Sequence, residues 1–312
     1  MTLIRKPYEL KTQSTVKALI YGQPGAGKTT LALSAPKVLL LDFDGGIHRI
    51  NPLHQVDTVQ IESWEDCINV LNEDLSMYQT IVIDTVGKAL DFLSVYLIKN
   101  EPKLGRKDGA LTLQGFGSRK YAFIAFMSKV SMMGKNLIFV AHEKEEKDGD
   151  QKIIRPEIGG SSAGDLIKEL DLVGYMELIG QKMTISFNPC EKYYGKNTCN
   201  LEPVIEIPRV NGSANVLFSL IVDQYKNGLE SRQKLAFDYN VIIENIKEQL
   251  EPCADSDSLN SFVEMLSKNE HIWDSKLQGG LRANDKAKEL GLVLNKTSKK
   301  YEPAKVKADD KV

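Results

Sequence analysis

Residues 22–29 could bind a phosphate chain. Their sequence, Gly-Gln-Pro-Gly-Ala-Gly-Lys-Thr, matches the pattern G-x-x-x-x-G-K-[ST] at every fixed position. Glycines let the backbone turn its N–H groups toward phosphate oxygens, and a helix beginning at Lys28 would point its positive end at the same anion. We expect Lys28 to contact the β- and γ-phosphates of ATP and the Thr29 hydroxyl to bind Mg²⁺. The predicted nucleotide contacts are Gly22, Gln23, Pro24, Gly25, Ala26, Gly27, Lys28, Thr29 and Thr30.

Two further segments place acids at the ends of apolar runs. Asp84 ends the run Ile-Val-Ile-Asp and is expected to hold a water of the Mg²⁺ shell, or alternatively only to cap the next helix. Thr85 follows it, so a glutamate directly after the metal ligand cannot activate the attacking water. Asp44, in the segment Asp-Phe-Asp-Gly-Gly, is our candidate for positioning that water. The alternative is that Asp44 only starts the glycine turn.

A histidine follows another predicted strand. His142 comes directly after residues 136–141, an apolar run expected to lie beside the strand that carries Asp84. At that strand end its imidazole could hydrogen-bond the γ-phosphate or the water, whatever its protonation state. A solvated surface histidine is the alternative.

The elements that must position these residues alternate between apolar runs and amphipathic stretches, which is typical of an α/β sheet. We predict a mostly parallel sheet flanked by helices, with an antiparallel hairpin around Gly180 and Gln181 at one end. The chain divides into an ATP-binding domain over 1–228, a small helical region over 229–295 and a lysine-rich, unstructured tail over 296–312. Strands are expected at 16–21, 38–42, 57–61, 81–84, 136–141, 172–179 and 182–187, and helices from Lys28, over 64–75, 216–225, 235–250 and 258–266.

Bulk composition excludes several classes of protein. A net charge of −2 argues against a protein that coats DNA through a global basic field. The four cysteines are scattered, without the paired spacing of a zinc site. No apolar run approaches the roughly 18 residues of a membrane span, so we expect a cytoplasmic protein without a membrane partner.

Taken together, the 22–29 loop, Asp44, the run ending at Asp84, and His142 resemble the RecA-like recombination ATPases. The similarity covers residues 14–225 and is strongest to phage-encoded single-strand-annealing ATPases, which often carry an AAA-type label. The resemblance implies a RecA-like core and ATP hydrolysis. It also implies that Asp44 polarises the attacking water, although the family usually has glutamate at this position. At His142 it implies a residue that couples the nucleotide state to DNA binding. It also implies a ring or filament of identical subunits, located in the host cytoplasm if the chain is phage-encoded.

A trans-acting cation is a further implication of this resemblance. RecA and RadA proteins place a cation of the neighbouring subunit at the γ-phosphate. The sequence Tyr-Gly-Lys-Asn-Thr at 194–198 is similar to the RadA-type element and offers Lys196, but Thr198 stands where arginine is expected. A solvated loop lysine is the alternative.

Two polar segments are the predicted DNA contacts. Residues 99–120 contain six basic and two acidic residues, several glycines and a phenylalanine on which a base could stack, which favours single-stranded DNA over a duplex. Residues 143–162 are mixed in charge, so we expect this segment to contact phosphates through its backbone or to become ordered when ATP binds, rather than to attract DNA by its charge. The candidate contacts are Lys103, Arg106, Lys107, Phe116, Arg119, Lys120 and Arg155. An exposed basic loop with no partner is the alternative.

Three functions compete. The leading one is an ATP-hydrolysing protein that binds single-stranded DNA in recombination, annealing or replication. The second is a nucleotide-gated interaction module that recruits a single-strand-binding protein or another replication partner without touching DNA. The third is a P-loop kinase, which we rank last because its expected lid has only Arg106 and Arg119.

Overall fold

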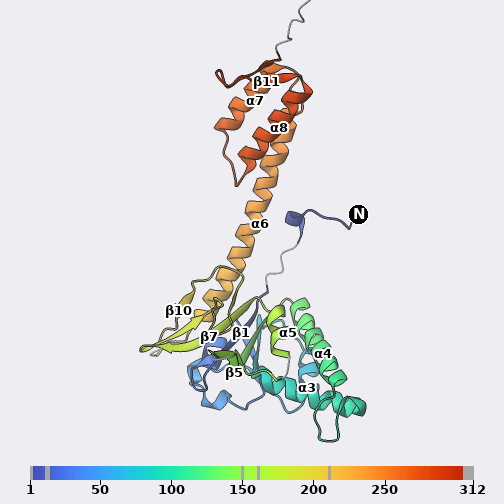
Figure 1. The fold of residues 1–312 in the computed structure, drawn as a ribbon. Coiled ribbons are helices and arrows are strands. Elements are labelled where there is room, and N and C mark those ends of the chain that lie inside the picture. The colour runs from blue at the N-terminus through green and yellow to red at the C-terminus, as the bar shows by residue number, and fades with distance from the viewer. Residues whose placement is uncertain (1–2, 11–14, 149–150, 160–161, 210–211, 305–312) are drawn as a thin grey trace, which may run out of the picture. The chain divides into compact units, whose positions relative to one another are not determined.

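The computed structural model describes residues 3–10, 15–148, 151–159, 162–209 and 212–304 (Figure 1). The chain forms two compact units. One comprises residues 13–229, and the other comprises residues 1–12 together with 230–312. This division lies next to the predicted boundary at 228, but the prediction assigns the first residues to the larger unit, whereas the structure groups them with the helical unit.

The larger unit is built on a mixed sheet whose central strands are parallel. The spatial order along the sheet is β10-β8-β7-β1-β5-β4-β2-β3, and β8 and β10 are antiparallel to their neighbours. The predicted α/β class is therefore confirmed, including the hairpin at Gly180. Its strands are β1 (Lys17–Gly22), β2 (Val38–Asp42), β3 (Thr58–Gln60), β4 (Thr80–Asp84), β5 (Asn136–Asp148), β6 (Gln151–Pro156), β7 (Leu172–Ile179), β8 (Lys182–Ser186), β9 (Lys196–Asn197) and β10 (Val204–Glu206).

Helices cover both faces of this sheet, which explains why the central strands are apolar along their whole length. One face packs against α2 (Trp64–Val70), α3 (Val86–Asn100), α4 (Leu113–Met132) and α5 (Ser162–Glu169). The other packs against α1 (Lys28–Ala32) and the start of α6 (Leu217–Leu250). Short 3₁₀ turns lie at η2 (Ile47–Arg49), η3 (Pro52–His54) and η4 (Pro102–Leu104).

Two segments expected to be loops are instead ordered elements. Residues 99–120 form the end of α3, η4, a turn and the first residues of α4, which begins after Thr112 caps it by accepting a hydrogen bond from the Gly115 N–H. Residues 143–148 and 151–156 pair as the two strands of a hairpin, because β5 continues to Asp148 and pairs with β6. Charged cross-strand pairs such as Lys152–Glu145 (2.9 Å) account for the polar sequence of this hairpin.

The smaller unit has its own core. The remainder of α6 packs with α7 (Ser256–Lys268) and α8 (Ser275–Glu289), and η1 (Pro7–Glu9) belongs to the same unit. The predicted helices at 216–225 and 235–250 prove to be parts of the single helix α6.

The prediction that the tail is unstructured from residue 296 is partly wrong. β12 (Tyr301–Pro303) pairs with β11 (Leu292–Leu294), and Tyr301 is buried. Residues 305–312 lie outside the described residues. Across the part of the chain that the structure describes, no helix is both long enough and apolar enough to span a membrane.

Candidate nucleotide site at the carboxyl edge of the sheet

The 22–29 segment forms a tight loop between β1 and α1. Gly25 (φ 78°) and Gly27 (φ 84°) adopt left-handed backbone conformations that residues with a Cβ rarely adopt. At Gly22 a Cβ would lie 2.5 Å from the carbonyl oxygen of Met176 on β7. The glycines are therefore needed by the shape of the loop and by its close contact with the neighbouring strand.

Lys28 places its ammonium group inside this loop. The side chain is buried, and Nζ donates hydrogen bonds to the carbonyl oxygens of Gly22 (3.0 Å) and Gln23 (2.7 Å). Burial lowers the pKa of Lys28, while the carboxylates of Asp84, Glu143 and Asp44 oppose this effect by favouring the charged form. The loop thus encloses a cation at the place where the sequence predicts phosphate binding.

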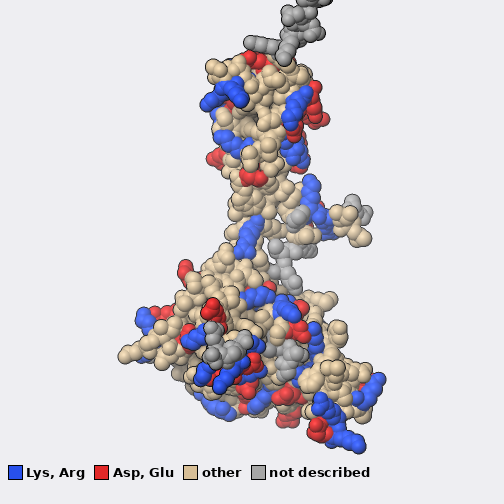
Figure 2. All heavy atoms as spheres, in the orientation of Figure 1, with Lys and Arg blue, Asp and Glu red and all other residues tan. Residues whose placement is uncertain are grey.

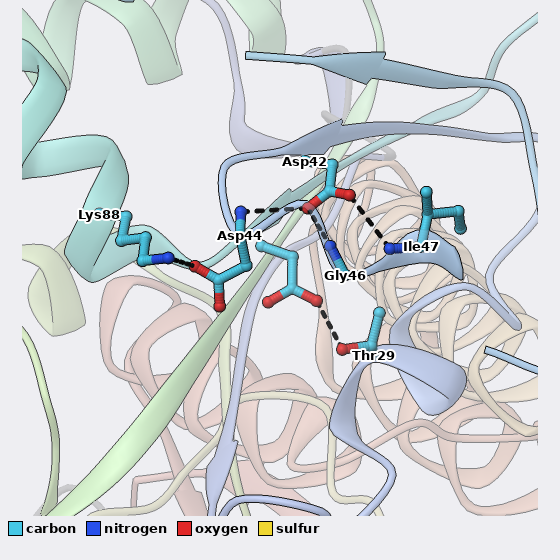
Figure 3. Close-up of polar contacts among 7 residues, drawn as sticks. Thr29, Asp42, Asp44, Gly46, Ile47 and Lys88 are labelled. Atoms are coloured by element: carbon cyan, nitrogen blue, oxygen red, sulfur yellow. Dashed lines mark hydrogen bonds and ion pairs between the residues drawn. The ribbon is translucent and has the colours of Figure 1, made fainter. Parts of the chain in front are cut away.

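At the start of α1, the Thr29 hydroxyl is hydrogen-bonded to a carboxylate in the close-up (Figure 3), and this carboxylate belongs to Asp84. The Thr29 hydroxyl donates to Oδ2 of Asp84 at 2.5 Å, and Asp84 is only 7% exposed. Burial raises the pKa of Asp84 to about 6; the nearby Asp44 and Asp42 carboxylates raise it as well, and the Thr29 hydrogen bond and Lys28 lower it. A divalent cation would stabilise the ionised form of this buried carboxylate.

The residues present fit Mg²⁺. A hydroxyl and a carboxylate are the hard oxygen ligands that Mg²⁺ takes, and in phosphate sites the remaining ligands are waters and phosphate oxygens. No group of three or more His, Cys, Asp or Glu that could hold a metal occurs among the described residues. Thr29 and Asp84 would therefore hold the ion together with a bound nucleotide.

Two aspartates at the end of β2 differ in their surroundings (Figure 3). The Asp42 carboxylate accepts hydrogen bonds from the backbone N–H groups of Asp44, Gly46 and Ile47, each at 3.1 Å. It thereby fixes the turn that follows the strand. The Asp44 side chain instead forms an ion pair with Lys88 on α3, at 2.8 Å.

A cavity of about 310 Å³ brings several of these side chains together. Asp44 and His142 both line it, Asp44 from the turn after β2 and His142 from within β5, and β4 lies between these two strands. His142 lies opposite Gly22 in the β1–β5 register, and its carbonyl oxygen accepts from the Glu157 N–H at 2.7 Å. The cavity is lined by Asp44, Thr85, Gly87, Lys88, Asp91, His142, Glu157 and Gly159.

Lys88 and Glu157 are cavity residues that the sequence reasoning missed. Lys88 stands four residues after Asp84, in the first turn of the helix that follows it, and this spacing was a usable signal. Glu157 reaches the cavity because the β5–β6 hairpin returns the chain to His142, in the middle of β5. Nothing local in the sequence indicated that return.

Lys196 does not extend from the surface in this structure. Its Nζ donates to the carbonyl oxygens of Ile167 (3.2 Å) and Lys168 (3.1 Å), in the last turn of α5. Cations are favourable at helix C-termini, so this contact stabilises the unit to which Lys196 belongs. The placement disfavours the predicted role as a cation donated to a neighbouring subunit.

Five of the seven predicted DNA contacts are engaged within the larger unit, four of them outside the turn between α3 and α4. Arg119 is 4% exposed, and its Nη2 donates to the carbonyl oxygen of Gly159 at 2.9 Å. Its guanidinium also lies 4.9 Å from the centre of the Phe116 ring, so this ring is already stacked. Lys120 pairs with Asp165 (2.8 Å), and Arg155 pairs with Glu146 (2.9 Å). These contacts argue against direct strand binding by the four residues.

The three predicted contacts on that turn remain at the surface. Lys103, Arg106 and Lys107 lie on the turn between α3 and α4 and are exposed, and Lys103 forms an ion pair with Glu101 of the same turn (2.5 Å). Figure 2 shows basic side chains with an acidic patch among them at the lower right, over this turn. We define residues 101–111 as the α3–α4 turn.

Comparison with known proteins supports a nucleotide site in the larger unit. Among curated proteins, no sequence matches the chain. Residues 14–199 match the AAA domain family, a match that covers more than half of the chain and includes the phosphate loop, Asp84 and His142. The larger unit, with its mostly parallel sheet and its glycine loop before α1, has the architecture of a P-loop nucleotide-binding ATPase. The chain therefore belongs to the AAA domain family.

Proposed function

We propose that this protein binds Mg-ATP at the carboxyl edge of the sheet, hydrolyses it, and uses the nucleotide to control its binding of single-stranded DNA. The observation that carries the proposal is the convergence of Lys28, the Thr29–Asp84 pair and the Asp44–His142 cavity beside four consecutive strands of the sheet, β1, β5, β4 and β2. These groups supply a cation, a metal site and a candidate base in one place.

The chemistry follows from the position of each group. Lys28 stabilises negative charge on the phosphates, and Mg²⁺ held by Thr29 and Asp84 would neutralise charge that develops on the phosphate oxygens. Asp44 orients a water in the cavity and accepts its proton as the water oxygen bonds to the γ-phosphorus. Lys88 holds the Asp44 carboxylate in place at 2.8 Å. ADP leaves with the electrons of the broken phosphorus–oxygen bond.

Contact with DNA is assigned to the α3–α4 turn. Lys103, Arg106 and Lys107 are exposed there and can neutralise backbone phosphates without reading sequence. The turn begins where α3 ends, and α3 starts two residues after Asp84, so one helix connects the metal site to the turn. A role in recombination or annealing rests on the resemblance to the RecA-like proteins.

The test is fluorescence anisotropy of labelled oligo(dT) with and without Mg-ATP. We expect Mg-ATP to strengthen binding by the unmodified protein, and Lys28→Ala to lose that gain. Reversing the charges of Lys103, Arg106 and Lys107 to Glu should weaken binding by about tenfold or more and flatten its salt dependence. The control reverses Lys276, Lys299 and Lys300, which are also exposed lysines but belong to the smaller unit.

The alternatives predict different results. A protein that binds ATP but no strand at low salt, with any nucleotide, would instead be a nucleotide-gated interaction module. A kinase would transfer its phosphate to an acceptor, so release of free phosphate with water as the only acceptor separates it from an ATPase. Phosphate release should be measured in the same samples.

A further inference from the structure

The sheet contains a gap one strand wide just beyond the phosphate loop. β1 ends at Gly22, which pairs with His142 of β5 on one side and Met176 of β7 on the other. Both neighbours continue: β5 extends to Asp148, and β7 extends to Ile179. The loop residues 23–26 therefore lie at the base of a slot whose sides are the β5–β6 hairpin and the β7–β8 hairpin.

The slot is a real cavity. Its volume is about 470 Å³, within the range of sites for small organic ligands. Ile154 of β6 contributes to one side, and the backbone N–H of Ile154 donates to the Lys192 carbonyl oxygen at 2.8 Å, which links the hairpin to the 188–195 segment. The lining residues are Gln23, Pro24, Gly25, Ala26, Ile154, Tyr175, Met176, Glu177, Leu178, Met183 and Lys192.

The sheet order gives the bound triphosphate a direction. Asp84 ends β4 and Asp44 follows β2, and these two strands come after β5 on one side of β1, whereas the slot lies toward β7 on the other side. A phosphate chain whose terminal phosphate faces Asp84 and Asp44 must leave the loop on the β7 side. We propose that the slot binds the nucleoside, the base and ribose, of that triphosphate, an inference that rests on the proposed function.

The chemistry of the lining suits a nucleoside. Met176, Met183 and Leu178 present an apolar surface, and methionine sulfur makes favourable contacts with aromatic rings. At the polar part of the slot, Glu177 and Lys192 form an ion pair at 3.3 Å. The carboxylate can accept from an amino group of the base or from ribose hydroxyls, and the ammonium can donate to a ring nitrogen.

The experiment compares two ligands that differ only in having a nucleoside. Isothermal titration calorimetry would measure Mg-ATP and Mg-tripolyphosphate on the full chain, on Met183→Glu and on the control Met183→Leu. We expect Met183→Glu to weaken Mg-ATP binding by about tenfold or more and to change tripolyphosphate binding by less than about twofold. Met183→Leu keeps an apolar side chain of similar size and should bind both ligands normally.

A second variant guards against misfolding. Leu178 is 62% exposed and lies opposite Met183 in the β7–β8 pairing, so Leu178→Glu adds the same charge to the slot with little loss of buried contacts. It should show the same selective loss of Mg-ATP affinity. If both glutamate variants bind Mg-ATP as well as the unmodified protein, or lose both ligands equally, the slot does not bind the nucleoside.

The failure of the proposed function would look different. In that case the unmodified protein would bind neither Mg-ATP nor tripolyphosphate, and Lys28→Ala would change nothing. That result would overturn both inferences, whereas glutamate variants that bind Mg-ATP normally, compared with an unmodified protein that binds both ligands, would overturn only the assignment of the slot.

Discussion

At the scale of single residues, identical side chains acquire different roles from their surroundings. Asp42 and Asp44 stand two positions apart, yet Asp42 is 3% exposed and its carboxylate accepts three backbone hydrogen bonds. Those hydrogen bonds stabilise the charged carboxylate and use it to hold the turn after β2 in place. Asp44 has a lysine partner and faces the cavity, so it remains available to a water molecule. Asp42 therefore has a structural role, whereas Asp44 is available for the proposed chemistry.

This division predicts the effect of removing one charge. Asp44→Asn should lower kcat for ATP hydrolysis by about 10²- to 10⁴-fold, because it removes the proton acceptor. Affinity for Mg-ATP should stay within about twofold, because the phosphates are held by other groups. Steady-state phosphate release and calorimetry would measure the two quantities.

Asp91→Asn is the matched control for this prediction, since Asp91 lines the same cavity and has no assigned role. It should leave kcat near normal. An Asp44→Asn protein with normal turnover would show that another carboxylate takes the proton, and Glu157 would be the next residue to test.

At the scale of elements, the antiparallel strands depend on close packing beneath them. Gly174 of β7 lies over Ile185 and Phe187, and a Cβ there would approach their side-chain atoms to 2.5 and 2.8 Å. Both neighbours are fully buried and cannot move aside easily. A glycine at this position lets β8 extend the sheet and complete the core on the α1 face.

We therefore expect Gly174→Ala to lower the free energy of unfolding by about 1–3 kcal/mol, the usual cost of overpacking a core. Gly117→Ala is the control: Gly117 lies in α4 with open space around it, so alanine should stabilise by up to about 1 kcal/mol. Urea denaturation followed by Trp64 fluorescence in a Trp273→Phe background would report on the larger unit alone. Equal effects of the two alanines would contradict the packing argument.

At the scale of the whole molecule, the cores of the two units are separate. Two apolar clusters flank the sheet, and a third joins α6, α7 and α8. α6 contributes Phe218, Ile221 and Val222 to the sheet core and Ile243 and Ile246 to the helical core. All residues from 226 to 242 are described, and none of them is buried. The nucleotide site thus depends on the larger unit.

A fragment of residues 13–229 should accordingly fold and bind Mg-ATP, with an increase in melting temperature on adding the ligand, as differential scanning fluorimetry would measure. A fragment of residues 13–215 is the matched comparison. It should fail to fold, because it lacks the α6 side chains that cover one face of the sheet. A stable 13–215 fragment, or an unfolded 13–229 fragment, would show that the units do not fold as assigned.

The sequence by itself determined the parts of this protein that short segments encode. The phosphate loop, the strand ends just before Asp44 and at Asp84, and the turn at Gly180 were predicted at their observed places, whereas the predicted strand end at His142 was wrong because β5 continues to Asp148. Each depends on local chain geometry: glycines in left-handed conformations, or apolar runs that end in a polar residue. Parallel strands then bring their carboxyl ends to one edge, so the site could be predicted without knowing the packing.

Only the tertiary structure decided which charged residues are engaged. Arg119 bonds Gly159, Lys196 bonds the end of α5, and Asp44 pairs with Lys88. In each pair the residues lie between 29 and 44 positions apart, so no local pattern indicates the contact. The slot beyond β1 likewise exists only because the two neighbouring hairpins extend farther than β1, the strand between them. Side-chain partners and cavities depend on long-range packing, which a single sequence does not specify.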